Sequence, residues 1–172
     1  MTHLPADNSF EHWSPDGLRI AFLSNRTGRL EAWLVARDRV GGPWHEAVQL
    51  TDFGCFSTYW APDGSGVLCV VQNGFVLVSA AGEVMWRRNT AAAGFSDVDP
   101  WVAMDRSSLY LSATRAGRRG NWTWPLAGGE PRLLVAHDDP LLVPEFMSVH
   151  GDHLYLTVAQ NESDIWVMDL KR

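Results

Sequence analysis

The run His137-Asp138-Asp139 offers an imidazole and two carboxylates in consecutive positions. These are groups that divalent cations accept as ligands. One loop cannot fill a coordination shell, so a metal centre here needs ligands from other segments. His150 and His153, three residues apart in a short turn, match no metal-binding spacing. We therefore predict no obligatory cofactor and keep a divalent cation at the first run as a hypothesis.

Further polar residues stand in segments that separate apolar runs, where loops are expected. Loops held by a rigid scaffold commonly carry binding residues, although loops are also polar simply because water surrounds them. Both readings stay open for this set. The candidate ligand-binding residues are Asp7, Asn8, His12, Asp52, Asp97, Asp99, Arg118, Arg119 and Asn161.

Several classes of chemistry find no support. The sequence has no Gly-x-Ser-x-Gly nucleophile turn, phosphate-binding glycine loop or dinucleotide fingerprint. Cys69 lies in the apolar run VLCVV, which is typical of a buried, unreactive thiol. The formal net charge of -6 disfavours nucleic acid, because phosphate neutralisation needs a basic surface. No apolar run approaches the roughly 20 residues of a membrane helix, so we expect no membrane partner.

The elements that must position these residues repeat along the chain. Trp13-Ser14-Pro15-Asp16-Gly17 precedes the strand-like run LRIAFLS, and Trp60-Ala61-Pro62-Asp63-Gly64 precedes SGVLCVV. Weaker copies place Asp105 and His150 at the same point, so the marks lie at 16, 63, 105 and 150. This period matches the roughly 40–45 residues of a four-stranded propeller blade. In the Pro-Asp-Gly turn the aspartate bonds back to the backbone and Gly accepts positive φ, so these aspartates are predicted to be structural.

The sequence therefore predicts an all-β protein, a β-propeller of four four-stranded antiparallel blades in one domain, residues 1–172. The expected innermost strands are SFEHW, FSTYW, VDPWVA and PEFMSV. The blade units run over about 7–53, 54–93, 94–137 and 138–172. The last unit lacks an outermost strand.

The stretch WSPDGLRIAFLSNRTGRLEAWLVARD, followed by AVQLTDF, resembles the propeller repeat of TolB and its relatives. Residues 13–51 carry the pattern well, 60–82 moderately and 97–172 only in outline. Relatives in that family usually have six or more blades, whereas four units are visible here. The resemblance implies a propeller, and its domain associations suggest a stand-alone regulatory propeller related to those of peptidases.

The missing strand can be supplied by the N-terminus. Leu133 follows Trp124 by 9 residues, and Leu4 follows Val167 by the same interval when the chain is counted through Arg172 to Met1. Residues 1–6 are thus predicted to complete the fourth blade, which removes an unpaired sheet edge. Either one chain closes as a four-bladed ring, or two chains exchange this strand and form an eight-bladed homodimer.

The sequence favours a non-catalytic scaffold that binds a protein or small polar ligand on the face made by the inter-blade loops. The alternatives are a metal-dependent hydrolase or lyase with a site at the ring axis, and the regulatory propeller implied by the resemblance. The start MTHLPADNSFEHW has no signal-peptide pattern. A cytoplasmic location is expected, or a periplasmic one if a leader has been removed.

Mass in solution tests the closure. We expect light scattering to give twice the mass of one chain, because the repeat resembles those of larger rings. Deletion of residues 1–6 should then produce aggregation, since it exposes an unpaired edge. A single-chain mass for the intact protein would favour the four-bladed ring instead.

Overall fold

The computed structural model describes residues 7–139, 143–159 and 163–169 as strands, turns and irregular segments. The all-β class expected from the sequence is confirmed, because these residues contain no helix. A search of the same residues for a helix long and apolar enough to cross a membrane finds none. The chain separates into two compact units, Met1–Asn89 and Thr90–Arg172, here called unit 1 and unit 2.

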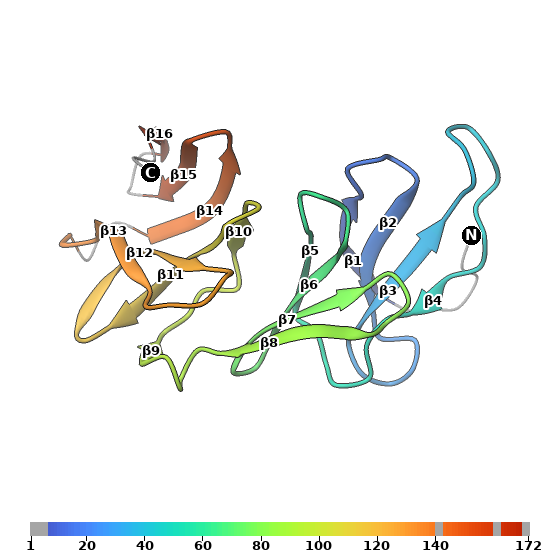
Figure 1. Cartoon of the computed structure of the whole chain (residues 1–172), viewed down its shortest axis with the longest axis horizontal. Helices are drawn as coiled ribbons and strands as arrows, with labels where there is room; N and C mark the ends of the chain where they lie inside the picture. Colours follow the sequence, from blue (N-terminus) through green and yellow to red (C-terminus); the bar gives the residue numbers. More distant parts are fainter. Residues whose placement is uncertain (1–6, 140–142, 160–162, 170–172) are drawn as a thin grey trace. The chain divides into compact units, whose positions relative to one another are not determined.

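Unit 1 contains two antiparallel sheets of four strands, each ordered as the strands follow in the chain (Figure 1). Both match the sequence expectation of a meander running from an inner to an outer strand. The strands of the first sheet are β1 (Asn8–Trp13), β2 (Arg19–Ser24), β3 (Glu31–Ala36) and β4 (Val48–Gln49). Those of the second sheet are β5 (Ser57–Trp60), β6 (Gly66–Val71), β7 (Gly74–Ser79) and β8 (Val84–Asn89).

Unit 2 also contains two antiparallel sheets. The strands of its first sheet are β9 (Phe95–Ser96), β10 (Val102–Met104), β11 (Ser108–Arg115), β12 (Arg118–Pro125) and β13 (Arg132–Ala136). Those of the second are β14 (Val143–His150), β15 (His153–Ala159) and β16 (Ser163–Asp169). The predicted closing strand, residues 1–6, lies outside the described residues. Closure of the ring, its blade count, the single domain and the homodimer therefore stay predictions.

The innermost strand of the third sheet along the chain differs from its expected course. VDPWVA was expected to form one strand, but β9 and β10 both pair with β11 and leave 97–101 as a loop between them. Asp97 has a φ of 48°, in the left-handed region, and Pro100 has no N–H to donate to a ladder. These two features interrupt the strand. The loop that results holds two of the predicted site residues.

The turn aspartates bond to the backbone, as predicted. Asp16 Oδ1 accepts from the Leu18 amide at 2.9 Å, and Asp63 Oδ1 accepts from the Ser65 amide at 2.9 Å. Gly17 and Gly64 take φ values of 67° and 72°, which a side chain would oppose. These bonds make the repeated Pro-Asp-Gly segment a turn between the first two strands of a sheet.

Each unit has an apolar core between its sheets. In unit 1, alternate residues of β2 and β3 pack against those of β6 and β7, because successive strand residues point to opposite faces. Full burial of one such aliphatic side chain contributes about 1.5–3 kcal/mol. The core residues of unit 1 are Ala21, Leu23, Ala32, Leu34, Leu50, Cys55, Val67, Cys69, Val76 and Val78. Those of unit 2 are Ala103, Tyr110, Leu154 and Leu156.

The β11–β12 hairpin offers two opposite tests of this backbone. A Cβ at Gly120 would overlap the carbonyl oxygen of Val135 in β13, so Gly120→Ala should lower the free energy of unfolding by about 1–3 kcal/mol. Ala116 has a φ of 50°, so Ala116→Gly should be neutral or stabilise by up to about 1 kcal/mol. Urea denaturation measures both. An unchanged midpoint for Gly120→Ala would contradict the pairing of β12 with β13.

Candidate functional site

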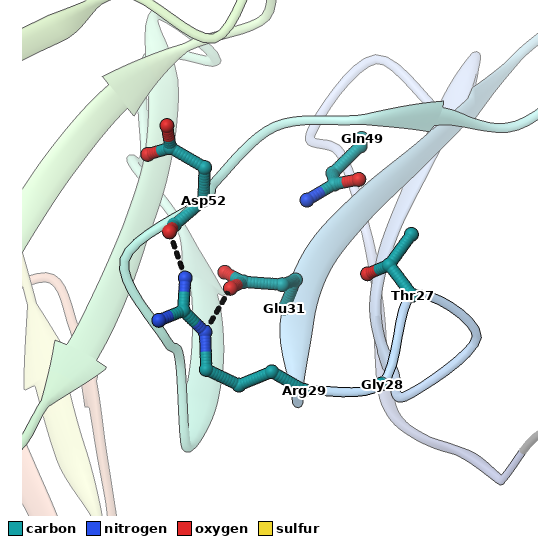
Figure 2. A pocket seen from close by; sticks show the side chains of 6 residues that line it. All are labelled: Thr27, Gly28, Arg29, Glu31, Gln49 and Asp52. Carbon is teal, nitrogen blue, oxygen red and sulfur yellow. Dashed lines mark hydrogen bonds and ion pairs between the residues drawn. The ribbon is translucent and has the colours of Figure 1, made fainter.

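A polar cavity of about 400 Å³ lies at one end of the first sheet of unit 1 (Figure 2). It is bounded by the turn between β2 and β3, the end of β4 and the loop that leads to β5. Every lining side chain is polar, and one of the six residues is glycine. The lining residues are Thr27, Gly28, Arg29, Glu31, Gln49 and Asp52.

Glu31, the first residue of β3, is the chemical centre of this cavity and is only 1% exposed. Its Oε2 accepts a hydrogen bond of 2.6 Å from the Thr51 hydroxyl, and both carboxylate oxygens accept from the Gly54 amide, at 3.1 and 3.0 Å. Arg29 Nε donates to Oε1 at 2.6 Å. A buried carboxylate is costly unless it is paired and hydrogen-bonded, and these contacts meet both conditions.

Arg29 covers the carboxylate from the solvent side. Its side chain is 59% exposed, and Nη2 donates to the backbone carbonyl of Asp52, as the dashed lines in Figure 2 show. The guanidinium thus joins β3 to the loop that follows β4. Removal of Arg29 would leave the carboxylate open toward the cavity.

Two of the other three sheets have no room for a side chain at the Glu31 position. Ser24 pairs with Glu31, and the equivalent residues of the next two repeats, Val71 and Ala113, pair with Gly74 and Gly120. At both glycines a Cβ would collide with the backbone of the outermost strand. In the first sheet β4 ends at Gln49, so the outermost strand does not reach this position.

A second polar cluster lies in unit 2 around Arg119 of β12. Arg119 Nη2 forms an ion pair of 2.6 Å with Asp99 Oδ2, and Nη1 donates to the carbonyl of Asp97. The amide of His137 donates to the Arg119 carbonyl at 3.0 Å. The structure therefore brings together Asp97, Asp99, Arg119 and His137, four residues that the sequence singled out.

His137 also faces a buried amide. One of its ring nitrogens, Nε2, is 2.6 Å from Oδ1 of Asn121, which is fully buried. Asn121 Nδ2 and His137 Nδ1 are buried atoms with no hydrogen-bond partner in the described structure. Burial and the nearby Arg119 lower the pKa of His137 more than Asp99 and Asp138 raise it. The imidazole is therefore held in its neutral form near pH 7.

The remaining predicted residues of unit 1 form smaller groups. The Asp7 amide donates to Asn25 Oδ1 at 3.1 Å, and Arg26 Nη2 donates to Asn8 Oδ1 at 3.1 Å, so both bind the turn after β2. The His12 carbonyl accepts from Trp60 Nε1 at 2.9 Å. Burial lowers the pKa of His12, against a weaker opposing effect of Glu11.

The other predicted site residues lie on separate segments of the chain. Asp52 lines the Glu31 cavity, and Arg118 is exposed at the start of β12. Asn161 lies outside the described residues. Within the described ranges, no group of three or more His, Cys, Asp or Glu side chains is arranged to hold a metal ion. A cation at His137, Asp138 and Asp139 stays a prediction.

Sequence reasoning missed two deeply buried polar residues, Glu31 and Asn121. Both stand in strand-like runs, EAWLVA and NWTWPL, where position alone suggests only a ladder partner. A signal was present in the carboxylate that opens the first run and in Thr51, which closes the repeat and donates to that carboxylate. Cys69 is a buried free thiol, as predicted, and its hydrogen bond with Cys55 and its burial raise its pKa.

The lowered pKa values of His12 and His137 set a pH dependence. The unfolded chain, with imidazole pKa near 6.5, binds protons that the folded chain excludes, so stability should fall as pH drops through about 6.5. His12→Gln and His137→Gln should each reduce this loss, and the double variant should reduce it most. Urea midpoints at several pH values check this, and an unchanged slope in the double variant would contradict it.

No protein-family model matches the chain. One curated relative, the uncharacterized peptidase YuxL of Bacillus subtilis (strain 168), is 39% identical over 75 residues, which is 42% of this chain and 11% of the peptidase. The chain thus spans about a tenth of the length of that relative.

Solved structures match almost the whole chain. A puromycin hydrolase aligns with a TM-score of 0.68 at 16% identity, covering 95% of this chain and 27% of the hydrolase. TolB from Acinetobacter baumannii aligns at 0.67 and 14% identity, covering 96% of this chain and 41% of TolB. An oligogalacturonate lyase in complex with manganese aligns with a TM-score of 0.67 at 14% identity, covering 95% of this chain and 50% of the lyase. These likenesses confirm the resemblance expected from the repeats: the chain has a TolB-like β-propeller fold.

Proposed function

We propose that the chain is a non-catalytic propeller module that binds a protein or a small polar ligand through the loops at one end of its sheets. The observation that carries this proposal is the organisation of those loops. In unit 1, Glu31 and Arg29 bind the loop after β4 at Gly54 and Asp52. In unit 2, Arg119 binds the loop before β10.

Both arrangements occur at equivalent ends of the sheets, where the second strand turns into the third. A loop held by charge-assisted hydrogen bonds loses less freedom when it binds, so less of the interaction energy is spent on ordering it. Exposed polar groups remain at these ends, including Asp52 and Arg118. Fixed loops that carry exposed polar groups are suited to binding a partner without a large loss of conformational freedom.

The second candidate is a stand-alone propeller that regulates a peptidase. It is favoured by the 39% identity with a peptidase over 75 residues. This candidate uses the same loop end and differs only in the partner. Identification of the bound protein separates the two.

Site-directed photo-crosslinking tests the proposal in cells that produce the full chain. Benzoylphenylalanine at Asp52 or Arg118 should give a crosslinked species, because both positions lie at the loop end. The same group at Ser65, in the exposed turn between β5 and β6, is the matched control and should give none. Equal yields at all three positions, or no product at any, would overturn a loop-end binding face.

A further inference from the structure

β1, the inner strand of the first sheet, contains a bulge formed by two consecutive residues. Ser9 pairs with Leu23 and His12 pairs with Ala21, so three steps along β1 correspond to two along β2. The two residues between them, Phe10 and Glu11, are both exposed, and the exposed fraction of Phe10 is 38%. A β-bulge re-aims side chains in this way, and bulges occur often beside functional sites.

The bulge stores backbone strain. Phe10 has a φ of 54°, a left-handed conformation that costs a residue with a side chain about 1–2 kcal/mol. The conformation is supported by the neighbouring strand, because the Thr58 hydroxyl donates to the Phe10 carbonyl at 3.0 Å. Such strain is characteristic of binding sites.

A second exposed phenylalanine precedes the neighbouring inner strand. The bonds from Thr58 to Phe10 and from Trp60 to His12 both span 48 residues, so the same offset places Phe56 level with Asn8. Phe56 is 50% exposed. It follows Gly54, whose amide is bound by the Glu31 carboxylate, so the loop that carries Phe56 is fixed.

Unit 2 has a shorter bulge on β14, in which Glu145 alone is unpaired and Phe146 pairs with Thr157 of β15. A bulge lies between Pro144 and Phe146, Glu145 is exposed, and Phe146 is 52% exposed. The Phe146 ring packs on Trp101, with centroids 4.6 Å apart. An exposed phenylalanine adjacent in sequence to a glutamate thus occurs at both bulges, and Phe146 packs on an aromatic side chain.

The charge around the unit 1 pair is negative. Exposed carboxylates adjoin both rings in the chain: Asp7, Glu11 and Asp52. Three arginines at this end have partners: Arg26 binds Asn8 and lies over the Trp33 ring, Arg29 binds Glu31, and Arg87 lies over the Phe53 ring. A ligand that contacts the phenylalanines therefore meets acidic groups whose charge is available to it.

We infer that Phe10, Glu11 and Phe56, here called the bulge surface, bind an extended peptide in which an apolar side chain adjoins a lysine or arginine. The inference rests on the proposed function and names the chemistry of its partner. The apolar side chain would cover the rings, and the cation would pair with the exposed carboxylates. A second copy of this chain fits less well, because a two-fold contact would bring the same acidic surfaces together.

Fluorescence anisotropy with defined peptides tests the inference on the full chain. The probes are labelled peptides of the sequence Gly-Ser-Leu-Lys-Leu-Lys-Gly-Ser, the same with glutamate for lysine, and the same with serine for leucine. The lysine–leucine probe should bind about tenfold more tightly than either of the others, because it alone supplies both apolar contact and positive charge. Equal binding of the three probes would overturn the inference.

Two variants and one control locate the binding. Phe56→Ser should weaken the lysine–leucine probe about tenfold, and Glu11→Gln should weaken it about threefold at low salt. Val84→Ser, which changes a 45% exposed residue of the outer strand β8, is the matched control and should have no effect. Circular dichroism and the urea midpoint verify folding. If Phe56→Ser does not fold, Glu11→Gln still decides, since it changes only an exposed group.

Two outcomes would reject the bulge surface as a peptide site. Unchanged binding in Glu11→Gln and Phe56→Ser would show that the probe binds elsewhere. A halved solution mass in Phe56→Ser would show that a second copy covers the surface. If Asp52 and Arg118 still crosslink a partner in either case, the proposed function stands and the peptide inference alone fails.

Discussion

In the first three sheets along the chain, the reach of the outermost strand determines what the third strand may carry at one position. Where β8 reaches Gly74 and β13 reaches Gly120, they lie so close to the third strand that only glycine fits at these two positions. Where β4 stops after Gln49, the same position holds Glu31 and the chain must satisfy a buried carboxylate. It does so with Thr51, Gly54 and Arg29, and the loop toward β5 is fixed as a result. Hydrogen bonds of these side chains thus take the place of the ladder that a longer β4 would form.

The fold could be predicted from the sequence because each clear repeat is marked by residues that form a specific turn. Asp16 and Asp63 bond the backbone of their turns, and such bonds depend only on nearby residues. The alternating runs around them are equally local. The misplaced strand at VDPWVA shows the limit of this reasoning. Its composition suits a strand, but β10 begins only at Val102, because Asp97 just before the run has positive φ and Pro100 within it has no N–H. The ion pair of Asp99 with Arg119, 20 residues later, also holds this loop.

The candidate site was predictable only in part, for a related reason. Loop polarity pointed to Asp97, Asp99, Arg119 and His137, which the structure brings together. Glu31 and Asn121 were not found, because each is a polar residue inside an apolar strand and owes its role to a partner on another segment. Pairing of this kind depends on where the outermost strand ends. No local pattern contains that information.

Strain is placed where recognition is expected. Among the described residues, those other than glycine with positive φ are Phe10, Asp97 and Ala116. All three lie in the loop-end halves of their sheets, where Gly28, Gly54 and Gly117 also take positive φ, and the marker turns at the opposite ends use Gly17 and Gly64 for the same backbone shape at little cost. Folding alone would favour glycine at both ends. Retention of a side chain at Phe10 places a partly exposed aromatic ring beside the Glu11 carboxylate, and a partner that contacts both would offset the cost of the strained backbone.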